Sequence, residues 1–319
     1  MERVTRGIAA LALAVVTTAC TADVTPPPKP VLEKNTIKVG VVPTADAAPL
    51  FIALRKGYFT HEGLIVEPQF IVGGAQAVPS LLSDRLDIGQ TDYISTFTAV
   101  SHGLPLKVVG AMSQAGPGTF GLMAGKNSGI ESLKDLKGKK VAVNILNGLA
   151  TLTVTAMLED AGMKASDVKF AEVPFPEMVR KLIDRQVDAA WLAEPFLTDG
   201  GSRGLLRPVP DTMAGRITDL PVGGWMAADE WREKNPQTLA AFQRAIAKAQ
   251  QVAAGSRKEV EAVLPTYMKI DAKTAAQTSL GAYPTALDLQ RLQRVADLMQ
   301  QHRYVNRPLD VKSLVATGS

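Results

Sequence analysis

Residues suited to binding a ligand follow four predicted strands, at the points where those strands end. The four sets are small or polar: Thr44, Ala45 and Asp46; Gly74, Ala75 and Gln76; Thr91, Asp92 and Tyr93; and Asn144, Asn147, Gly148 and Leu149. Ligands of open α/β sheets bind beyond the carboxyl ends of the strands, where backbone amides and helix starts are exposed. The sets therefore predict non-covalent binding of a polar molecule if the four loops converge. Each loop taken alone is also explained by ordinary turn chemistry.

The loop before Leu149 has the clearest physical basis for binding. Asn147 and Gly148 precede a predicted helix, and the first amides of a helix are free donors with a partial positive charge. Glycine at this point also lets a ligand approach the backbone closely. We therefore expect this helix start to offer hydrogen-bond donors to a ligand.

Nucleotide-binding motifs are incomplete in this chain. Residues 116–121 have the glycine spacing of a dinucleotide fingerprint, but the next segment reads as a strand or turn where a helix must begin. Gly121 and Gly125-Lys126 lack one residue of a phosphate-binding loop, and Asn127 stands where Ser or Thr would bind magnesium. No nucleotide cofactor is therefore expected.

Side chains for metal or nucleophilic chemistry are sparse. The histidines, His61, His102 and His302, are too widely separated for the spacing of a zinc site. There is no nucleophile elbow, and the only cysteine, Cys20, precedes the globular part. The sequence thus predicts no metal site, no cofactor and no catalytic residue.

An N-terminal leader ends at Cys20, the single cysteine among 319 residues. Arg3 and Arg6, an apolar run over 8–16 and small residues before the cysteine are the parts of a secretory signal. The apolar run is too short for a membrane-spanning helix, which needs about 20 residues.

A cysteine after small residues resembles the lipobox of bacterial lipoproteins, although Thr17 occupies the usual leucine position. This resemblance implies a signal peptide over 1–19, acylation of Cys20 and an extracytoplasmic protein anchored by lipid to the cell membrane. Ordinary cleavage nearby, which would leave a free thiol, is the alternative.

Residues 20–35 form the predicted lipid anchor and spacer. Their run Pro26-Pro27-Pro28-Lys29-Pro30 favours polyproline II, a semi-rigid conformation that would hold a globular body away from a membrane. The net charge of +4 comes from scattered residues without a basic stripe, so no nucleic-acid partner is expected. Because a single cysteine cannot form an intramolecular disulfide, stability must come from burial of the core.

The body alternates between predicted strands and helices, which is the pattern of an α/β protein. The predicted strands are 37–42, 65–72, 87–90, 107–112, 140–143, 168–173, 189–192 and 220–227. The predicted helices are 49–56, 80–86, 133–136, 149–161 and 177–185, followed by a mostly helical chain after Asp229. Proline inside a helix costs about 3 kcal/mol, so the helix that contains Pro79 is predicted to begin at Val78, after a long loop.

Several short segments, in one order, carry a resemblance to a known family. They are Ile37–Gly40, Pro43–Pro49, Lys56–Phe59, Glu62–Leu64, Gly73–Gln76, Asp87–Gly89, Leu104–Val109, Leu133–Val143, Val187–Trp191 and Glu194–Phe196. Together they resemble bacterial solute-binding proteins of the nitrate, sulfonate and taurine type, which include thiamine-pyrimidine binders and serve ABC importers. The resemblance covers about residues 37–225 and is weak after Asp229.

The resemblance implies a two-lobed, type II periplasmic-binding-protein-like α/β fold. Lobe 1 would comprise 36–118 and 222–319, and lobe 2 would comprise 119–221, with two strand crossovers between them and the ligand in the cleft. The implied function is capture of a small polar organic solute by lobe closure and its delivery to an ABC permease, by a monomer without enzymatic activity. Glu194 and Trp225 join the candidate ligand-binding residues. Trp225 is equally compatible with the core, and Trp191 is predicted to be core.

Two other classes of function remain as alternatives. One is an enzyme on the same fold, such as the pyrimidine-synthesising relatives or a pyrrole-polymerising deaminase. Both of those families depend on cysteines within the domains, and this chain has none there. The other is a lipoprotein used only for adhesion or scaffolding, which would not need the four loops described above.

The charge of the candidate loops bears on the ligand. Asp46, Asp92 and Glu194 lie in these loops, which hold no lysine or arginine. Carboxylates facing a ligand repel anions, and the repulsion grows as the cleft dries. This predicts a neutral or cationic solute with N–H or O–H donors, such as an amine or a pyrimidine. The alternative is that Glu194 and Asp92 cap helices, so that only Asp46 bears on the ligand.

Overall fold

The computed structural model describes residues 30–209, 217 and 219–316. The chain divides into two units, Met1–Pro30 and Val31–Ser319, and every element given below belongs to the second. Cys20, the predicted signal peptide and most of the predicted spacer lie outside the described residues. Within the described ranges, no helix is both long enough and apolar enough to cross a bilayer.

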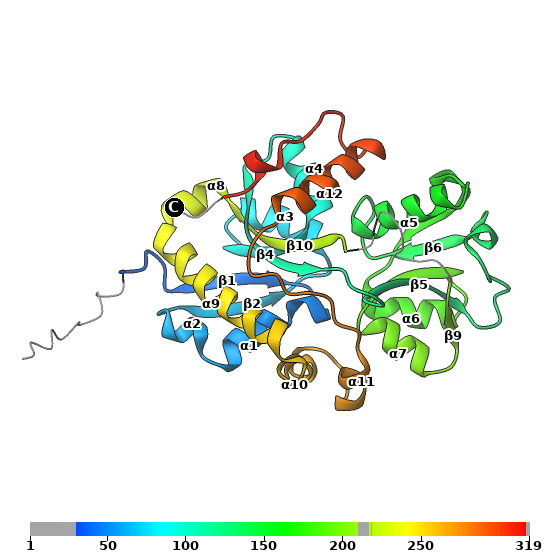
Figure 1. Cartoon of the computed structure of the whole chain (residues 1–319), viewed down its shortest axis with the longest axis horizontal. Helices are drawn as coiled ribbons and strands as arrows, with labels where there is room; N and C mark the ends of the chain where they lie inside the picture. The colour runs from blue at the N-terminus through cyan, green and yellow to red at the C-terminus, as the bar shows by residue number, and fades with distance from the viewer. Residues whose placement is uncertain (1–29, 210–216, 218, 317–319) are drawn as a thin grey trace, which may run out of the picture. The chain divides into compact units, whose positions relative to one another are not determined.

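Two five-stranded sheets form the framework (Figure 1). Sheet A has the strand order β2-β1-β3-β10-β4, and sheet B has the order β7-β6-β8-β5-β9. The strands of sheet A are β1 (Thr36–Val41), β2 (Ile65–Phe70), β3 (Ile88–Asp92), β4 (Leu106–Gln114) and β10 (Pro221–Ala228). Those of sheet B are β5 (Phe120–Gly125), β6 (Lys140–Val143), β7 (Lys169–Glu172), β8 (Ala189–Ala193) and β9 (Leu206–Pro208).

The two sheets share one pattern of pairing. In sheet A, β1 pairs in parallel with β2 and β3, and β10 runs antiparallel between β3 and β4. In sheet B, β6 pairs in parallel with β7 and β8, and β5 runs antiparallel between β8 and β9. The carboxyl ends of the parallel strands in each sheet therefore lie along one edge, which is where ligands bind in α/β folds.

The chain crosses between the sheets twice. It leaves sheet A after β4, builds all of sheet B, and returns as β10, which is inserted between β3 and β4. These are the two crossovers expected from the sequence. The lobe limits at residues 119 and 222 stay a prediction; they fall in the connection between β4 and β5 and at the start of β10.

Helices cover both sheets. They are α1 (Ala48–Arg55), α2 (Tyr58–His61), α3 (Gly74–Leu82), α4 (Tyr93–Ser101), α5 (Leu149–Asp160), α6 (Phe175–Ile183), α7 (Phe196–Ser202), α8 (Asp229–Lys234), α9 (Pro236–Gly255), α10 (Arg257–Tyr267), α11 (Ala272–Gln277) and α12 (Leu289–Gln301). Short 3-10 turns occur at η1 (Ala45–Ala47), η2 (Leu133–Leu136), η3 (Ala165–Asp167) and η5 (Val311–Leu314). Helices α1 and α2 pack on α9, whereas α3 and α12 pack on α4, so sheet A has two helical groups.

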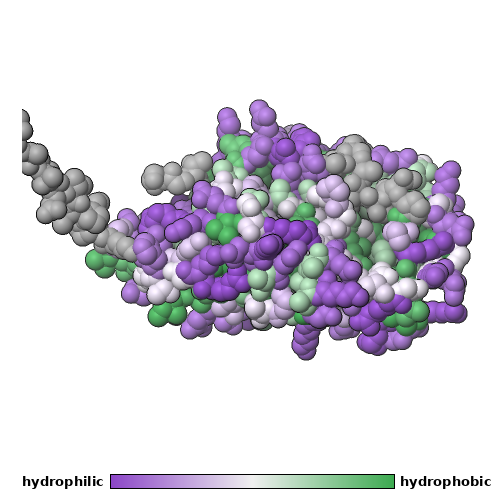
Figure 2. Space-filling model, turned by 60° about the horizontal axis from the view of Figure 1, so that its bottom comes forward, coloured by the Kyte–Doolittle hydropathy of each residue, from purple (hydrophilic) through white to green (hydrophobic). Residues whose placement is uncertain are grey.

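Apolar side chains are concentrated in the interior. Strands β8 and β10 are buried along their whole length, as expected of strands that have neighbours on both edges and helices over their faces. On the face drawn in Figure 2, hydrophilic residues predominate and hydrophobic ones form small separate patches. With no disulfide available, burial of this core is the main source of stability.

The predicted start of α3 at Val78 is wrong. The helix begins four residues earlier, at Gly74, and Pro79 lies in its interior. A Cβ atom on Gly74 would lie 2.7 Å from the Asp92 nitrogen, so glycine lets the first turn of α3 pack directly on the end of β3. The amide of Val72 donates to Gln76 Oε1 at 3.0 Å, which ties the preceding loop to the helix. These contacts offset the hydrogen bond that Pro79 cannot donate.

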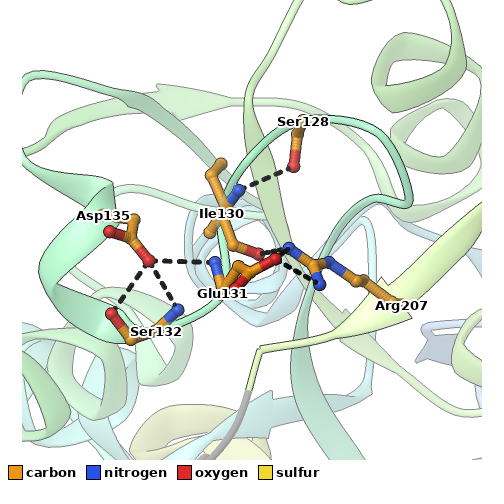
Figure 3. A network of polar contacts seen from close by, with 6 residues as sticks. All are labelled: Ser128, Ile130, Glu131, Ser132, Asp135 and Arg207. Carbon is orange, nitrogen blue, oxygen red and sulfur yellow. Dashed lines mark hydrogen bonds and ion pairs between the residues drawn. The ribbon is translucent and has the colours of Figure 1, made fainter.

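The connection between β5 and β6 is held by a polar network at the surface (Figure 3). Arg207 of β9 donates to the carbonyl of Ile130 at 2.5 Å and lies 3.5 Å from the Glu131 carboxylate. Asp135 accepts hydrogen bonds from the amides of Glu131 and Ser132, at 2.9 and 2.8 Å. The network fixes the path of the chain into β6, whose end carries Asn144.

Candidate functional site

One cavity is lined by residues from both sheets. Its volume is about 60 Å³, which is below the range of typical small-molecule sites, so a larger solute would need the cavity to open. Its lining residues are Val42, Thr44, Asp46, Gly73, Gly74, Gln90, Thr91, Asp92, Met112, Phe120, Asn144, Ile145, Gly148, Leu149, Phe175, Trp191, Ala193, Val222 and Gly223. The cavity thus lies where the ends of β1 and β3 meet those of β6 and β8.

Each of the four predicted loops contributes to this lining. The predicted residues in contact with the cavity are Thr44, Asp46, Gly74, Thr91, Asp92, Asn144, Gly148 and Leu149. The predicted residues outside its lining are Ala45, Ala75, Gln76, Tyr93, Asn147, Glu194 and Trp225. The four loops therefore converge, whereas the contact of any one residue with a ligand stays a prediction.

Asp46 is the half-buried carboxylate of the cavity wall. Burial raises the pKa of Asp46 to about 6, and the neighbouring hydroxyls of Ser113 and Thr44 act in the opposite direction. Both hydroxyl oxygens are buried, and neither meets hydrogen-bond geometry with another atom of the described residues. Apart from their effect on Asp46, the hydroxyls of Thr44 and Ser113 thus have no other partner among the described residues, and the three side chains form one polar group.

Asp92 caps a helix. Its Oδ1 accepts from the Ser95 amide at 2.9 Å, and its Oδ2 accepts from the Ser95 hydroxyl at 2.7 Å, at the start of α4. Burial raises the pKa of Asp92, while these hydrogen bonds oppose the rise. Asp92 lines the cavity, but both of its oxygens already serve α4.

Glu194 also serves the protein rather than the cavity. It accepts from the Thr198 amide and hydroxyl at 3.0 and 2.7 Å, and from the Ser279 amide at 2.9 Å. It thereby caps α7 and joins that helix to the segment after α11. These hydrogen bonds agree with the alternative that Asp92 and Glu194 cap helices, which leaves Asp46 as the one of the three carboxylates without a capping role.

Two tyrosines from the C-terminal region hold the loop that carries Asp46. The Tyr267 hydroxyl donates to the carbonyl of Thr44 at 2.9 Å, and the Tyr283 hydroxyl donates to that of Ala45 at 3.0 Å. Burial and the nearby Asp46 charge both raise the pKa of each tyrosine. The Ala45 amide also donates to the Glu194 carbonyl at 3.3 Å, so the backbone groups of Ala45 are not free for a ligand.

An aromatic wall faces these polar groups. Phe120 and Trp191 stack with their ring centroids 4.8 Å apart, and Phe175 lies 6.2 Å from Trp191. Trp191 is buried, as predicted, but it also lines the cavity, and its indole nitrogen has no hydrogen-bond partner among the described residues. Trp225 is fully buried away from this cavity and meets Phe242 edge-on at 5.5 Å.

The start of α5 offers backbone donors to the cavity. Gly148 is its N-cap, and as a glycine it has no side chain that could cap the first turn. Asn147 has a φ of 57°, a left-handed conformation that asparagine tolerates, and this turns the chain into the helix. The free amides at Leu149 and beyond are therefore available to a hydrogen-bond acceptor.

Some site residues were not found from the sequence. Gln90 accepts the Val42 amide through Oε1 at 2.9 Å, so its NH₂ group is the donor it can offer. Ser113, at the end of β4, and Phe120, at the start of β5, flank the first crossover. Trp191 lies in the segment Val187–Trp191, which carried part of the family resemblance. Its place in that segment was the one sequence feature that could have marked it as a site residue.

The described residues hold no cluster of three or more His, Cys, Asp or Glu side chains arranged to bind a metal ion. The cavity lining also contains no histidine, lysine or arginine among the residues that the structure describes. The arrangement suits binding through hydrogen bonds, one carboxylate and aromatic contact.

The model of the NMT1/THI5-like family matches residues 44–260. The riboflavin-binding protein RibY of Chloroflexus aurantiacus is 26% identical over 231 residues, which cover 71% of this chain and 64% of that protein. The 4-amino-5-hydroxymethyl-2-methylpyrimidine phosphate synthase THI5 of Saccharomyces cerevisiae is 27% identical over 237 residues, covering 68% of this chain and 66% of the synthase. The chain thus spans about two thirds of the length of these two relatives.

The fold is that of periplasmic binding proteins. The periplasmic nitrate-binding protein NrtA from Synechocystis PCC 6803 superposes with a TM-score of 0.76 at 18% identity, covering 89% of this chain and 86% of NrtA. This likeness confirms the predicted two-sheet α/β fold. Because the family model covers more than half of its residues, the chain belongs to the NMT1/THI5-like family.

Proposed function

We propose that this protein is the substrate-binding component of an ABC importer, which captures a small polar solute by lobe closure and delivers it to the permease. One observation carries the proposal: groups from both sheets converge on a single cavity and leave buried hydrogen-bonding atoms unsatisfied there. The binding role named for RibY and for NrtA supports it. No bond of the solute is made or broken in this function.

The cavity favours a neutral or cationic solute. Its one carboxylate free of helix capping is Asp46, and the described lining holds no cationic side chain to offset that charge. The amides at the start of α5 can donate to an electron-rich atom, and the aromatic wall suits a flat ring. An aminopyrimidine combines these features, because it offers N–H donors to Asp46 and a ring face to Trp191, whereas a simple amine offers the N–H donors alone.

A second candidate function is an enzyme on the same fold. Asp46 favours it, since a buried carboxylate with a pKa of about 6 is suited to accept a proton near neutral pH. The synthase activity named for the yeast relative points the same way. The described cavity lining contains neither a thiol nor an imidazole that could act with Asp46.

Purification without refolding, followed by mass spectrometry of the co-purified ligand, tests both functions. For a binding protein, the same ligand is recovered unchanged after incubation, and at 100 times its Kd it raises the free energy of unfolding by about 2.7 kcal/mol. Asp46→Asn should weaken binding, whereas Glu67→Gln, which removes an exposed carboxylate on β2, should not. Conversion of the ligand into a new product that stops in Asp46→Asn would establish the enzyme instead.

A further inference from the structure

An apolar groove adjoins the cavity. Every residue that lines it is apolar: Val42, Pro43, Phe70, Ile71, Val72, Pro174, Phe175, Pro176 and Phe196. Val42 and Phe175 also line the cavity, so the two spaces share a wall. The groove has a volume of about 190 Å³, which is larger than the roughly 60 Å³ of the cavity.

The two sides of the groove come from different parts of the fold. Phe70 ends β2 of sheet A and Val72 follows that strand, and they are 59% and 44% exposed. Opposite them, Phe175 and Phe196 begin α6 and α7, and their rings stack with centroids 5.7 Å apart. A single exposed apolar residue is normal, but apolar surfaces facing one another across a groove mark a place where burial would release free energy.

The chemistry of the two spaces differs sharply. The cavity holds Asp46, Gln90, Thr44 and Asn144, and its buried Thr44 hydroxyl and Trp191 indole N–H lack partners among the described residues. No polar side chain of the described residues lines the groove. A molecule that occupies both must therefore be polar at one end and apolar at the other.

We propose that this groove is a second subsite, which receives an apolar extension of the solute whose polar head lies in the cavity. The inference rests on the proposed binding function and narrows its substrate class to amphiphilic small molecules, with an amine or heteroaromatic head and an aliphatic or aromatic tail. The shared wall at Val42 and Phe175 makes the small-molecule tail the occupant, because the groove lies directly beside the cavity.

The length of the tail supplies the test. The probes are n-alkylamines from ethylamine to octylamine, titrated by calorimetry into the purified, ligand-free protein. Each methylene that enters an apolar site contributes about 0.8 kcal/mol, so affinity should rise about fourfold per methylene once the chain reaches the groove. The double variant Phe70→Ser, Val72→Ser should reduce this increment, while ethylamine binding remains as in wild type.

A matched control lies on the same strand. Ile65, at the other end of β2, is 61% exposed and does not line the groove. Ile65→Ser should leave the increment per methylene unchanged. Asp46→Asn should weaken every amine by a similar factor and leave the increment unchanged. An increment that is absent in wild type, or that survives intact in the double variant, overturns the subsite.

A second series separates failure of the subsite from failure of the proposed function. Hexan-1-ol and octan-1-ol, followed by ligand-observed NMR, carry the tail without a charged head. If amines bind through Asp46 without a length effect, the binding function stands and the subsite is wrong. A second outcome is that no amine binds, whereas the alcohols bind with an affinity that rises with chain length and the double variant removes this rise. The subsite then stands, and the preference for a cationic head is wrong. Absence of binding in both series overturns the subsite and the preference for a cationic head, while the proposed binding function is tested separately by the co-purified ligand.

Discussion

At the scale of single residues, the site depends on which polar groups the protein leaves unsatisfied. Asp92 and Glu194 are consumed by helix capping, whereas Asp46 lies beside two buried hydroxyls that have no other partner in the described part of the chain. Leaving such groups buried and unpaired costs stability. A ligand with matching donors and acceptors forms the missing hydrogen bonds and regains that free energy. A ligand without such groups does not, so the cavity selects for the matching one.

Binding of a cationic ligand should depend on pH through Asp46. Its pKa in the folded protein is about 6, raised mainly by burial, so the carboxylate is lost below that value. We expect the affinity for an amine to fall by up to tenfold per pH unit below about pH 6, measured by calorimetry between pH 5 and 8. Asp46→Asn should bind weakly with a flat profile. The same pH dependence in Asp46→Asn would assign it to another group.

The same shift affects stability in a defined direction. Because folding raises the pKa of Asp46, the protonated form stabilises the fold below about pH 3.8, and this contribution is lost as pH rises through about 6. Asp46→Asn should therefore unfold at higher denaturant than wild type at pH 8. The difference between the two proteins should shrink toward pH 4.

Trp191 should report ligand binding by fluorescence. It lines the cavity, whereas Trp225 lies outside the lining and is fully buried. The change in emission on ligand binding should disappear in Trp191→Phe and persist in Trp225→Phe. Trp191→Phe should also weaken a ligand that accepts from the indole N–H, by about 1 kcal/mol for one hydrogen bond. A signal lost in Trp225→Phe instead would place the ligand elsewhere.

At the scale of elements, the C-terminal helices position the ligand loop of β1. Tyr267 ends α10 and Tyr283 follows α11, and both donate to carbonyls of the loop that carries Asp46. Tyr267 is itself fixed by stacking on Phe51 of α1, with ring centroids 3.8 Å apart. Both tyrosines lie beyond residue 260, where the family match ends, so part of the site is set by a region that the family model does not cover.

Removing either hydroxyl should loosen this loop. Tyr267→Phe and Tyr283→Phe each delete one donor and leave a carbonyl without its bond, so we expect a loss of about 1 kcal/mol in the free energy of unfolding. Ligand affinity should fall several-fold, and the apparent pKa of Asp46, followed by NMR, should shift. Tyr58→Phe is the control, because Tyr58 on α2 lies under Lys248, outside the cavity lining. An unchanged Asp46 pKa would show that the tyrosines act only on stability.

At the scale of the described body, contacts join the parts built on the two sheets. Besides the bonds of Glu194 to Ser279, His302 Nδ1 after α12 lies 3.3 Å from Glu159 of α5. A Cβ atom on Gly73 would lie 2.3 Å from Ile145, so the two sides of the cavity approach closely at that point. Opening of the cavity, which the proposed mechanism requires, would have to separate Gly73 from Ile145.

The proposed anchor is tested on the intact chain. If Cys20 is acylated, Cys20→Ser should move the protein from the membrane fraction to the soluble extracytoplasmic fraction. Its ligand affinity should be unchanged, because no residue of the cavity lies near the leader in sequence. A Cys20→Ser protein that stays with the membrane would show that another feature holds it there.

The two crossovers were predicted from the family resemblance. The sequence by itself determined the alternation of strands and helices and the four loops that line the cavity. Local periodicity and turn residues specify these last two features, and strand ends of a parallel sheet meet at one edge whatever the detailed packing. Only the tertiary structure decided how the polar residues are used. Asp92 and Glu194 are satisfied by capping, Trp191 rather than Trp225 reaches the cavity, and α3 begins at Gly74 despite Pro79. Tyr267 and Tyr283 meet the Asp46 loop from more than two hundred residues away. Hydrogen-bond partners and burial arise from such distant contacts, so local sequence patterns do not encode them.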